Sequence, residues 1–340
     1  MSNEVLNLLF EATGVLTLAL VAVLLLRGGW LRAFGARNTL LLWLIAPIAL
    51  VALLLPAPVE RIDLAAGDAA TASESAQALL PAIRERVIEM SPSGVPAPGG
   101  VWQAAAPIDM AVLILGVWLV GAGLLAGRMS VNQVRLVRSL GPLTRMSNGC
   151  FRSSVSDIGP AVVGAIRPRI VLPADFEQRF SVEQQALIIA HERCHLRRGD
   201  AQFNLLACVL RCLFWFNPVV HLAWPRLRMD QELACDAAVL RTRRRQRRAY
   251  AEALLAARSN APALPLGCPW LSGKPLTRRI QLTFTHPIGS IRLLCGTALV
   301  LLTASVAALG AWNQQEPRRF YLPDSVLGLE LHVTAAEPDA

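Results

Sequence analysis

Charged residues are scarce in this chain. Asp, Glu, Lys and Arg make up 17% of its 340 residues, whereas 54% are hydrophobic and the mean hydropathy is +0.44. This balance is too apolar for an ordinary soluble domain, so we expect several membrane-spanning helices. The apolar runs hold few ionisable residues and no repeat is evident, which argues against a transporter. A cleavable signal peptide is not expected either, because the first apolar run is long and has an acidic start.

The long apolar runs predict four membrane spans, two within residues 1–55, one at 108–127 and one at 289–312. Arg27 follows the first run and Arg128 the third, whereas residues 56–107 carry more acid than base. Under the positive-inside rule, residues 128–288 should lie in the cytoplasm, with residues 56–107, the tail 313–340 and both termini outside. The sequence therefore predicts a multi-pass protein of the bacterial cytoplasmic (inner) membrane, in contact with its lipid.

Cysteine is absent from the segments predicted to lie outside. The seven cysteines occupy positions 150, 194, 208, 212, 235, 268 and 295. An odd number confined to the reducing side of a membrane argues against a disulfide framework.

Histidine is rare too, yet two of the five histidines lie four residues apart, in His191-Glu192-Arg193-Cys194-His195. Residues four apart share one face of an α-helix, so both imidazoles can bind one Zn²⁺, and Glu192 can reach a water on it. A hydrolytic zinc needs three protein ligands and an open position, and the carboxylate takes the proton as water attacks a carbonyl. The pattern predicts a zinc peptidase; two surface histidines beside a glutamate are the alternative.

The ends of this helix are also marked in the sequence. Ser181 is a candidate N-cap with Gln184 as its capping-box partner, and Gly199 should end the helix. Arg193 lies well round the helix from the ligand face, so we expect it in solvent.

The third ligand must come from elsewhere in the chain. Glu232 and Asp236 lie one turn apart on the next predicted polar helix, as a carboxylate ligand and a carboxylate that orients an imidazole would. Cys194 and Cys235 are thiolate alternatives, and His221 is a further rival whose neighbours Pro218 and Trp224 favour a packed or interfacial position.

The other parts of residues 128–288 suggest how a substrate could bind. Ser153–Ser156 and Ile166–Leu172 are predicted strands, and the prolines around Arg169–Leu172 favour an edge strand to which an extended peptide could add itself. Residues 203–220 are expected to form a core helix or an insertion into the inner leaflet, and a long helix should run from Trp224 to about Ala257. Its basic stretch at 241–248 favours a solvated or lipid-facing surface.

Four segments, taken in order, resemble the membrane metallopeptidase family of bacterial β-lactam sensor-transducers, the antirepressor proteins. They are Pro168-Arg169-Ile170-Val171-Leu172-Pro173, then His191-Glu192-x-x-His195-x-x-Arg198-x-Asp200, Trp215-Phe216-Asn217-Pro218, and Glu232-x-x-Cys235-Asp236.

The resemblance implies an α-helical membrane protein with a cytoplasmic α+β domain of zincin-like (gluzincin) type between spans three and four. It implies His191, His195 and Glu232 as Zn²⁺ ligands and Glu192 as the base. The best-known members carry a large penicillin-binding sensor at the C-terminus, where this sequence has a short tail and departs from the family.

We therefore expect a zinc endopeptidase of signal transduction that cleaves itself or a cytoplasmic transcriptional repressor after an external signal. Residues 259–277, a linker rich in Pro and Gly, could supply the extended substrate, and direct binding of nucleic acid is not expected. The alternative is a non-catalytic membrane transducer whose zinc is structural.

Overall fold

The computed structural model describes residues 2–57, 59–63, 110–257, 268–269, 275–284, 288–315 and 318–322. The chain divides into two units, one made of residues 1–54 and 109–311 and the other of residues 55–108 and 312–340. In the second unit, strand β1 (Val59–Asp63) pairs in parallel with β7 (Arg318–Leu322). The remainder of the region between residues 64 and 109 lies outside the described residues.

Within the described part, three helical stretches are long and apolar enough to cross a membrane. They are Ser2–Leu53, α4 (Met110–Ser139) and α11 (Ser290–Asn313). The first comprises α1 (Ser2–Leu41), the 3-10 turn η1 (Leu42–Leu44) and α2 (Ile45–Leu53). Two of the four predicted spans thus form one bent stretch, and the count of four stays a prediction.

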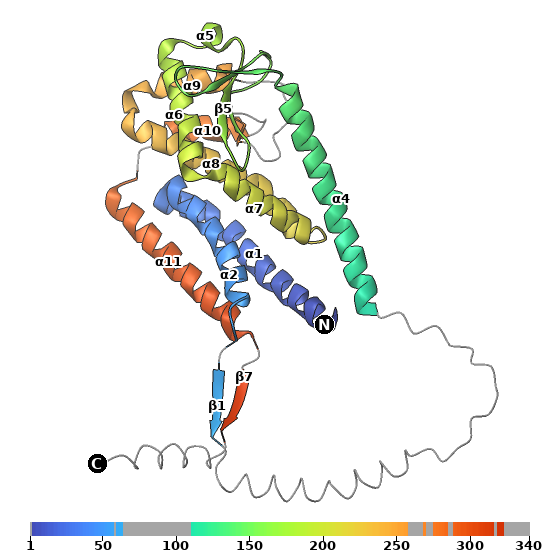
Figure 1. Ribbon diagram of the computed structural model, residues 1–340. Helices are drawn as coiled ribbons and strands as arrows, with labels where there is room; N and C mark the ends of the chain where they lie inside the picture. The colour runs from blue at the N-terminus through green and yellow to red at the C-terminus, as the bar shows by residue number, and fades with distance from the viewer. Residues whose placement is uncertain are drawn as a thin grey trace, which may run out of the picture. The chain divides into compact units, whose positions relative to one another are not determined.

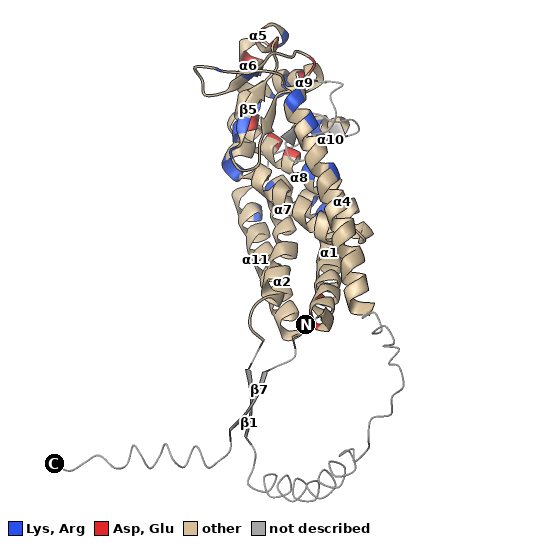
Figure 2. Cartoon of the chain, turned by 45° about the vertical axis from the view of Figure 1, so that its right-hand side comes forward, with Lys and Arg blue, Asp and Glu red and all other residues tan. Residues whose placement is uncertain are grey.

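The bend in the first stretch is at Gly35, whose φ of 81° lies in the left-handed region that glycine adopts at little cost. Beyond it the chain folds back along α1, because Leu42 and Trp43 share a buried cluster with Leu16 and Leu20. Figure 1 shows α2 beside α1 as a result. Charged side chains gather near one end of these helices, and the length below is almost free of them (Figure 2).

A five-stranded mixed sheet lies at the charged end, in the order β2-β3-β5-β4-β6. Its strands are β2 (Leu143–Arg145), β3 (Phe151–Ser153), β4 (Ala161–Val163), β5 (Arg169–Leu172) and β6 (Cys268–Pro269). Only β3 and β5 pair in parallel; the other pairs are antiparallel.

The expectation that Arg169–Leu172 forms an edge strand is wrong. β5 lies between β3 and β4, and its last three residues are buried. Pro168 and Pro173 stand just outside the strand, so neither removes a backbone N–H from the ladder. On the far side of β4 the edge position is taken by β6, which pairs with β4 in antiparallel.

Six helices complete this region: α5 (Phe176–Arg179), α6 (Val182–Arg198), α7 (Asp200–Leu213), α8 (Pro218–Thr242), α9 (Arg247–Ala256) and α10 (Pro275–Thr283). The helix expected from Trp224 to about Ala257 starts earlier, because Pro218 fits a first turn capped by the Asn217 side chain. It breaks at Arg243, and the 3-10 turn η2 (Arg244–Gln246) separates α8 from α9.

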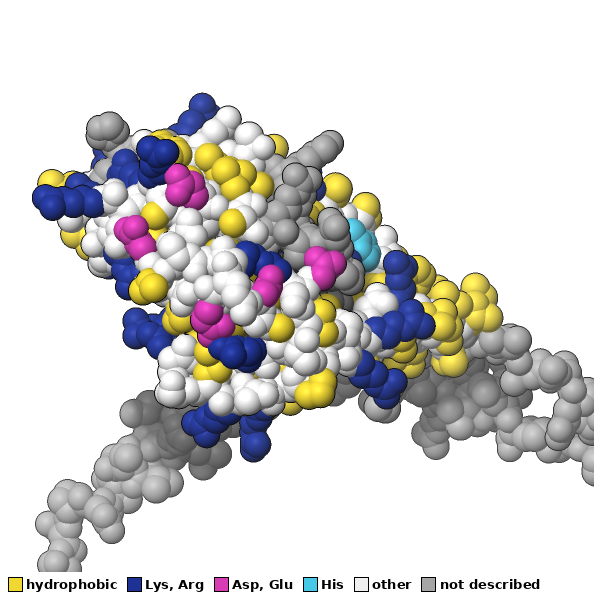
Figure 3. Space-filling model, turned by 90° about the horizontal axis from the view of Figure 1, so that it is seen from above, with side chains coloured by type: hydrophobic (Ala, Val, Ile, Leu, Met, Phe, Trp, Pro, Cys, Tyr) yellow, Lys and Arg dark blue, Asp and Glu magenta, His cyan; other side chains and the backbone are white. Residues whose placement is uncertain are grey.

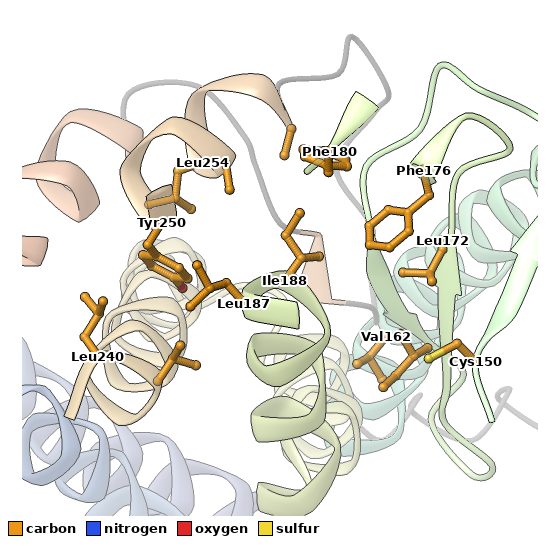
Figure 4. Close-up of a cluster of buried hydrophobic side chains, with 14 of the residues drawn as sticks. Cys150, Val162, Leu172, Phe176, Phe180, Leu187, Ile188, Leu240, Tyr250 and Leu254 are labelled. Atoms are coloured by element: carbon orange, nitrogen blue, oxygen red, sulfur yellow. The ribbon is translucent and has the colours of Figure 1, made fainter. Parts of the chain in front are cut away.

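The core of this region joins the sheet to α6, α8 and α9. Figure 4 shows Val162 and Leu172 from the sheet facing Leu187 and Ile188 of α6, with Tyr250 of α9 on the other side. Leu187 and Ile188 are fully buried and lie one turn before His191, so the core fixes the helix that carries the histidine pair. Seen from above, this end carries many basic side chains, with hydrophobic and acidic side chains between them (Figure 3).

Candidate metal centre

Helix α6 holds His191, Glu192 and His195 in fixed positions. The predicted N-terminal capping box is confirmed, since Ser181 and Gln184 each bond the other's backbone N–H, and Gly199 ends the helix with φ 74°. His191, Glu192 and His195 are all buried, whereas Arg193 is exposed as expected. The buried face of α6 thus carries the three residues of the motif.

The two imidazoles converge on the carboxylate of Glu232. The Nε2 atoms of His191 and His195 are 3.0 Å apart, and the Glu232 oxygens lie 3.4 Å from the first and 3.5 Å from the second. Glu232 reaches them from α8, which packs against α6. The three residues that the sequence predicted as ligands therefore place their donor atoms around one point.

Asp200 orients His195. Its Oδ2 is 2.6 Å from the Nδ1 of His195, and Arg198 bonds both of its oxygens. Asp200 reaches the imidazole because the left-handed Gly199 turns the chain back before α7 begins. An Nδ1–H donated to this carboxylate leaves the Nε2 lone pair of His195 directed at Glu232 and His191.

Asp236 and Tyr250 do the same for His191. The Tyr250 hydroxyl donates to Asp236 Oδ1 at 2.6 Å and lies 2.8 Å from His191 Nδ1, which is itself 3.2 Å from Asp236 Oδ1. Because the hydroxyl proton goes to Asp236, His191 must donate its Nδ1–H to the tyrosine oxygen. In the neutral imidazole, the Nε2 lone pair of His191 is therefore directed at the same point.

Arg279 of α10 holds the two carboxylates of α8. Its Nε and Nη2 donate to Asp236 at 2.8 and 2.7 Å, and its Nη1 is 2.9 Å from Glu232 Oε2. Only 1% of Arg279 is exposed, which makes it one of the largest fully buried side chains among the described residues. The guanidinium offsets the negative charge of two carboxylates on one helix turn.

Glu192 stands beside this cluster without a strong partner. Neither of its buried oxygens has a hydrogen bond of good geometry to another described residue, although a backbone group of Val162 in β4 is close to it. Burial raises the pKa of Glu192 to about 8. A buried carboxyl group with its oxygens left open is suited to exchanging a proton with a water or a substrate.

The titration of the other groups follows from burial and from their partners. Burial would lower the pKa of His191, but bonds to Asp236 and Glu232 outweigh it and raise the pKa to about 9. For His195 burial dominates, and the pKa is lowered. Burial would raise the pKa of Glu232 and of Asp236, but the charge of Arg279 leads the effects that hold both below their usual values.

Cys235 is the alternative ligand that the geometry leaves open. One donor atom each from His191, His195 and Cys235 lie within 4.8 Å of one another. Burial, and then a hydrogen bond with Cys194, raise the pKa of the Cys235 thiol well above its usual value, which disfavours the thiolate that a metal needs. We favour Glu232, because both of its oxygens face the Nε2 atoms.

His221 is not part of the cluster. Its Nε2 is 2.8 Å from the carbonyl oxygen of Trp215, and its Nδ1 is 3.5 Å from Arg211, in a packed position as the sequence suggested. Sequence reasoning gave no role to Asp200, Tyr250 or Arg279. The turn at Gly199 could have indicated Asp200, whereas nothing in the local sequence distinguishes Arg279 from the arginine before it.

The donor set fits a divalent metal such as zinc. The centre has two imidazoles that converge on a carboxylate, a hydrogen-bonded partner behind each imidazole, and a glutamate with open oxygens. These features together are those of a metallopeptidase type of centre. The chain that carries it also has apolar helices long enough to span a membrane. Comparison with known proteins agrees with this class. A family model described as BlaR1 peptidase M56 matches residues 8–283, so the chain belongs to that family.

Individual relatives match a shorter part of the chain. The regulatory protein BlaR1 of Bacillus licheniformis is 37% identical over 83 residues, which are 24% of this chain and 14% of that protein. The methicillin resistance mecR1 protein of Staphylococcus aureus is 33% identical over 97 residues, 28% of this chain and 17% of the relative. The matched part thus spans less than a fifth of the length of either protein.

Proposed function

We propose that this protein is a zinc-dependent endopeptidase of signal transduction, embedded in the bacterial cytoplasmic membrane by four spans. His191, His195 and Glu232 would hold the Zn²⁺, with Asp200 and Asp236 orienting the imidazoles. Zinc, when bound, supplies a Lewis acid for peptide hydrolysis. The catalytic unit, of zincin-like type, would face the cytoplasm, because Arg27 and Arg128 mark that side of the first and third predicted spans.

The role of the chain's own base falls to Glu192. A pKa near 8 in the buried site suits a group that takes a proton from the attacking water and passes it to the departing amine. Its neighbours support this role, since Glu232 lies against both imidazoles and Arg279, whereas neither oxygen of Glu192 has a hydrogen bond of good geometry to a described residue. Asp200, Tyr250 and Arg279 then act by position only.

The pairing of β6 with β4 is the main observation in favour of the linker 259–277 as a substrate. Cys268 pairs with Val162, the residue whose backbone lies close to Glu192. An antiparallel segment added to a strand beside the catalytic helix is how a peptide substrate binds by backbone hydrogen bonds. Cys268–Pro269 belongs to the predicted linker 259–277, most of which lies outside the described residues.

We infer that this linker is a substrate of the centre. Its cleavage would release β6 from β4 and separate α8 and α9 from α11. The freed strand could then receive a second polypeptide, such as a cytoplasmic transcriptional repressor. The external signal would act through residues on the opposite side of the membrane.

A structural zinc is the second candidate, since Cys235 could complete a closed set with His191, His195 and Glu232. The neutral thiol and the open Glu192 weigh against it.

Intact-mass measurement of the full chain tests the proposal. Wild type, Glu192→Gln and Glu183→Gln would be expressed side by side; Glu183 is an exposed glutamate on the first turn of the same helix. We expect two fragments for the wild type and Glu183→Gln, with a cut within 259–277, and one intact chain for Glu192→Gln with its zinc retained. Intact chains in all three samples under every inducing condition would exclude the proposal that the chain cleaves itself. Cleavage that persists in Glu192→Gln would contradict the assignment of Glu192 as the base.

A further inference from the structure

The turn between α7 and α8 contacts the middle of two apolar helices. Trp118 of α4 donates its Nε1–H to the carbonyl of Leu213 at 2.6 Å, and Trp215 donates to the carbonyl of Trp118 at 3.2 Å. On the other side, Asn217 Nδ2 donates to the Thr17 hydroxyl of α1 at 2.7 Å. The turn is therefore held at defined heights along both α1 and α4.

Those two heights agree with each other. Thr17 precedes Arg27 by ten residues, and Trp118 precedes Arg128 by the same ten. A rise of about 1.5 Å per residue places each contact ~15 Å below the first arginine of its helix. The apolar core of a bilayer is about 30 Å thick, so both helices independently put the turn near the midplane.

The surface of this hairpin, α7 with the first turns of α8, is apolar over the same depth. Every exposed side chain between residues 205 and 225 is apolar, whereas Gln202 and Arg226 are exposed just beyond these limits. The exposed residues are Leu205, Leu206, Val209, Leu213, Phe216, Pro218, Leu222 and Pro225. In Figure 2 the lower part of α7 lies in the length almost free of charge. Exposing such an apolar face to water costs free energy, whereas contact with acyl chains does not.

Two ionisable groups within the hairpin, His221 and Arg211, lie against neighbouring groups of the protein. His221 meets the carbonyl of Trp215, and the guanidinium of Arg211 lies 5.1 Å from the Trp224 ring centre and 3.5 Å from His221. Polar side chains in a membrane are expected to be paired in this way or to extend toward its surface. Arg228, closer to the charged end along α8, also lies over the Trp224 ring, 5.5 Å from its centre.

The side of the hairpin that faces α1 and α2 is partly packed and partly open. Phe214, Val220 and Ala223 join the buried cluster of the membrane helices. A small open pocket remains between them, with almost wholly apolar walls that include Leu16, Leu20, Pro47, Phe203, Leu206 and Leu210. A hydrocarbon chain matches the character of these walls.

We propose that the α7–α8 hairpin is a re-entrant membrane element that enters the leaflet on the metal-centre side and turns back near the midplane. Acyl chains of phospholipids cover its exposed face and border the apolar pocket. Asp200, which orients His195, is the first residue of the inserted arm, so the centre lies within a few turns of the membrane surface. This placement does not depend on which side of the membrane is cytoplasmic.

Depth-dependent quenching in the full chain tests the insertion. A fluorescent amino acid, acridonylalanine, would replace Phe216 at the turn or Leu222 on α8, which are 44% and 51% exposed. Ile166, 87% exposed on the loop between β4 and β5, is the matched control. The proteins would be reconstituted in phosphatidylethanolamine–phosphatidylglycerol vesicles carrying a nitroxide either near the acyl-chain end or on the head group. Aqueous iodide would be the third quencher.

The expected result is several-fold stronger quenching at Phe216 by the acyl-chain nitroxide than by the head-group nitroxide or iodide. Leu222 should respond to the acyl-chain nitroxide as well, and Ile166 to iodide. Iodide quenching at Phe216 as strong as at Ile166 would overturn the insertion. Protection from all three quenchers at both hairpin positions would also overturn the proposal, because protein rather than lipid would then cover the face.

Discussion

Replacing Arg279 by Met should strongly destabilise the metal-free protein. The side chain keeps its apolar length but loses three contacts of 2.7–2.9 Å to Asp236 and Glu232, in a site where Arg279 is only 1% exposed. Removing one partner of a buried ion pair costs about 3–5 kcal/mol, because the other charge stays buried without compensation. At ~2–4 °C per kcal/mol for domains of 150–250 residues, the melting temperature should fall by roughly 6–20 °C.

Thermal unfolding of the detergent-solubilised full chain, with a chelator present, would measure this shift. The adjacent Arg278 is exposed on the same helix and provides the control. Arg278→Met should change stability by no more than about 0.5 kcal/mol, as surface substitutions do. Equal melting temperatures for the two variants would refute the reasoning.

A double variant separates loss of charge balance from loss of packing. Asp236→Asn removes one of the two carboxylates that Arg279 holds, so combining it with Arg279→Met should cost less than the sum of the two single changes. Coupling of about 1–3 kcal/mol is expected for residues in one buried network. Strict additivity would mean that Arg279 and Asp236 contribute to stability independently of each other.

Three further outcomes follow from the contacts of the centre. Asp200→Ala should weaken zinc binding by about 10–100-fold, because His195 loses the carboxylate that orients it; unchanged affinity in a chelator competition would contradict this. Between pH 6 and 8 zinc affinity should rise by up to about tenfold per unit, because the pKa of His191 is about 9 and its proton must leave on binding. A zinc affinity that does not change between pH 6 and 8 would exclude a protonated His191 in the metal-free protein. Asp230→Asn should lower the melting temperature by less than Arg279→Met does, since the part-buried Arg27 guanidinium loses its counter-charge.

Local signals in the sequence sufficed where a short segment determines its own structure. The capping box at Ser181 and the left-handed Gly199 fix the ends of α6, and the spacing of His191 and His195 places both on its buried face. These features need no information from distant parts of the chain.

The sequence did not predict the features that depend on contacts between distant parts of the chain. The prolines around β5 indicate an edge strand only if they belong to the ladder, and the structure places them just outside it. The helix break at Arg243 and the short strands β2 and β4 have no strong local pattern. Arg279 is buried because α8 offers it two carboxylates, which its own neighbours in sequence cannot reveal.

The contact between Asp230 and the first apolar helix has a thermodynamic consequence for signalling. Asp230 is fully buried, accepts from Arg27 at 2.6 and 3.0 Å and from the indole of Trp43 at 2.9 Å, and precedes Glu232 by two residues on α8. A displacement of α1 that keeps these hydrogen bonds would move the turn of α8 that supplies the carboxylate of the metal centre. Linkage between two binding events is reciprocal. If a signal that shifts α1 changes zinc affinity by some factor, zinc must change the affinity for that signal by the same factor, so the metal content of the protein would itself set its sensitivity.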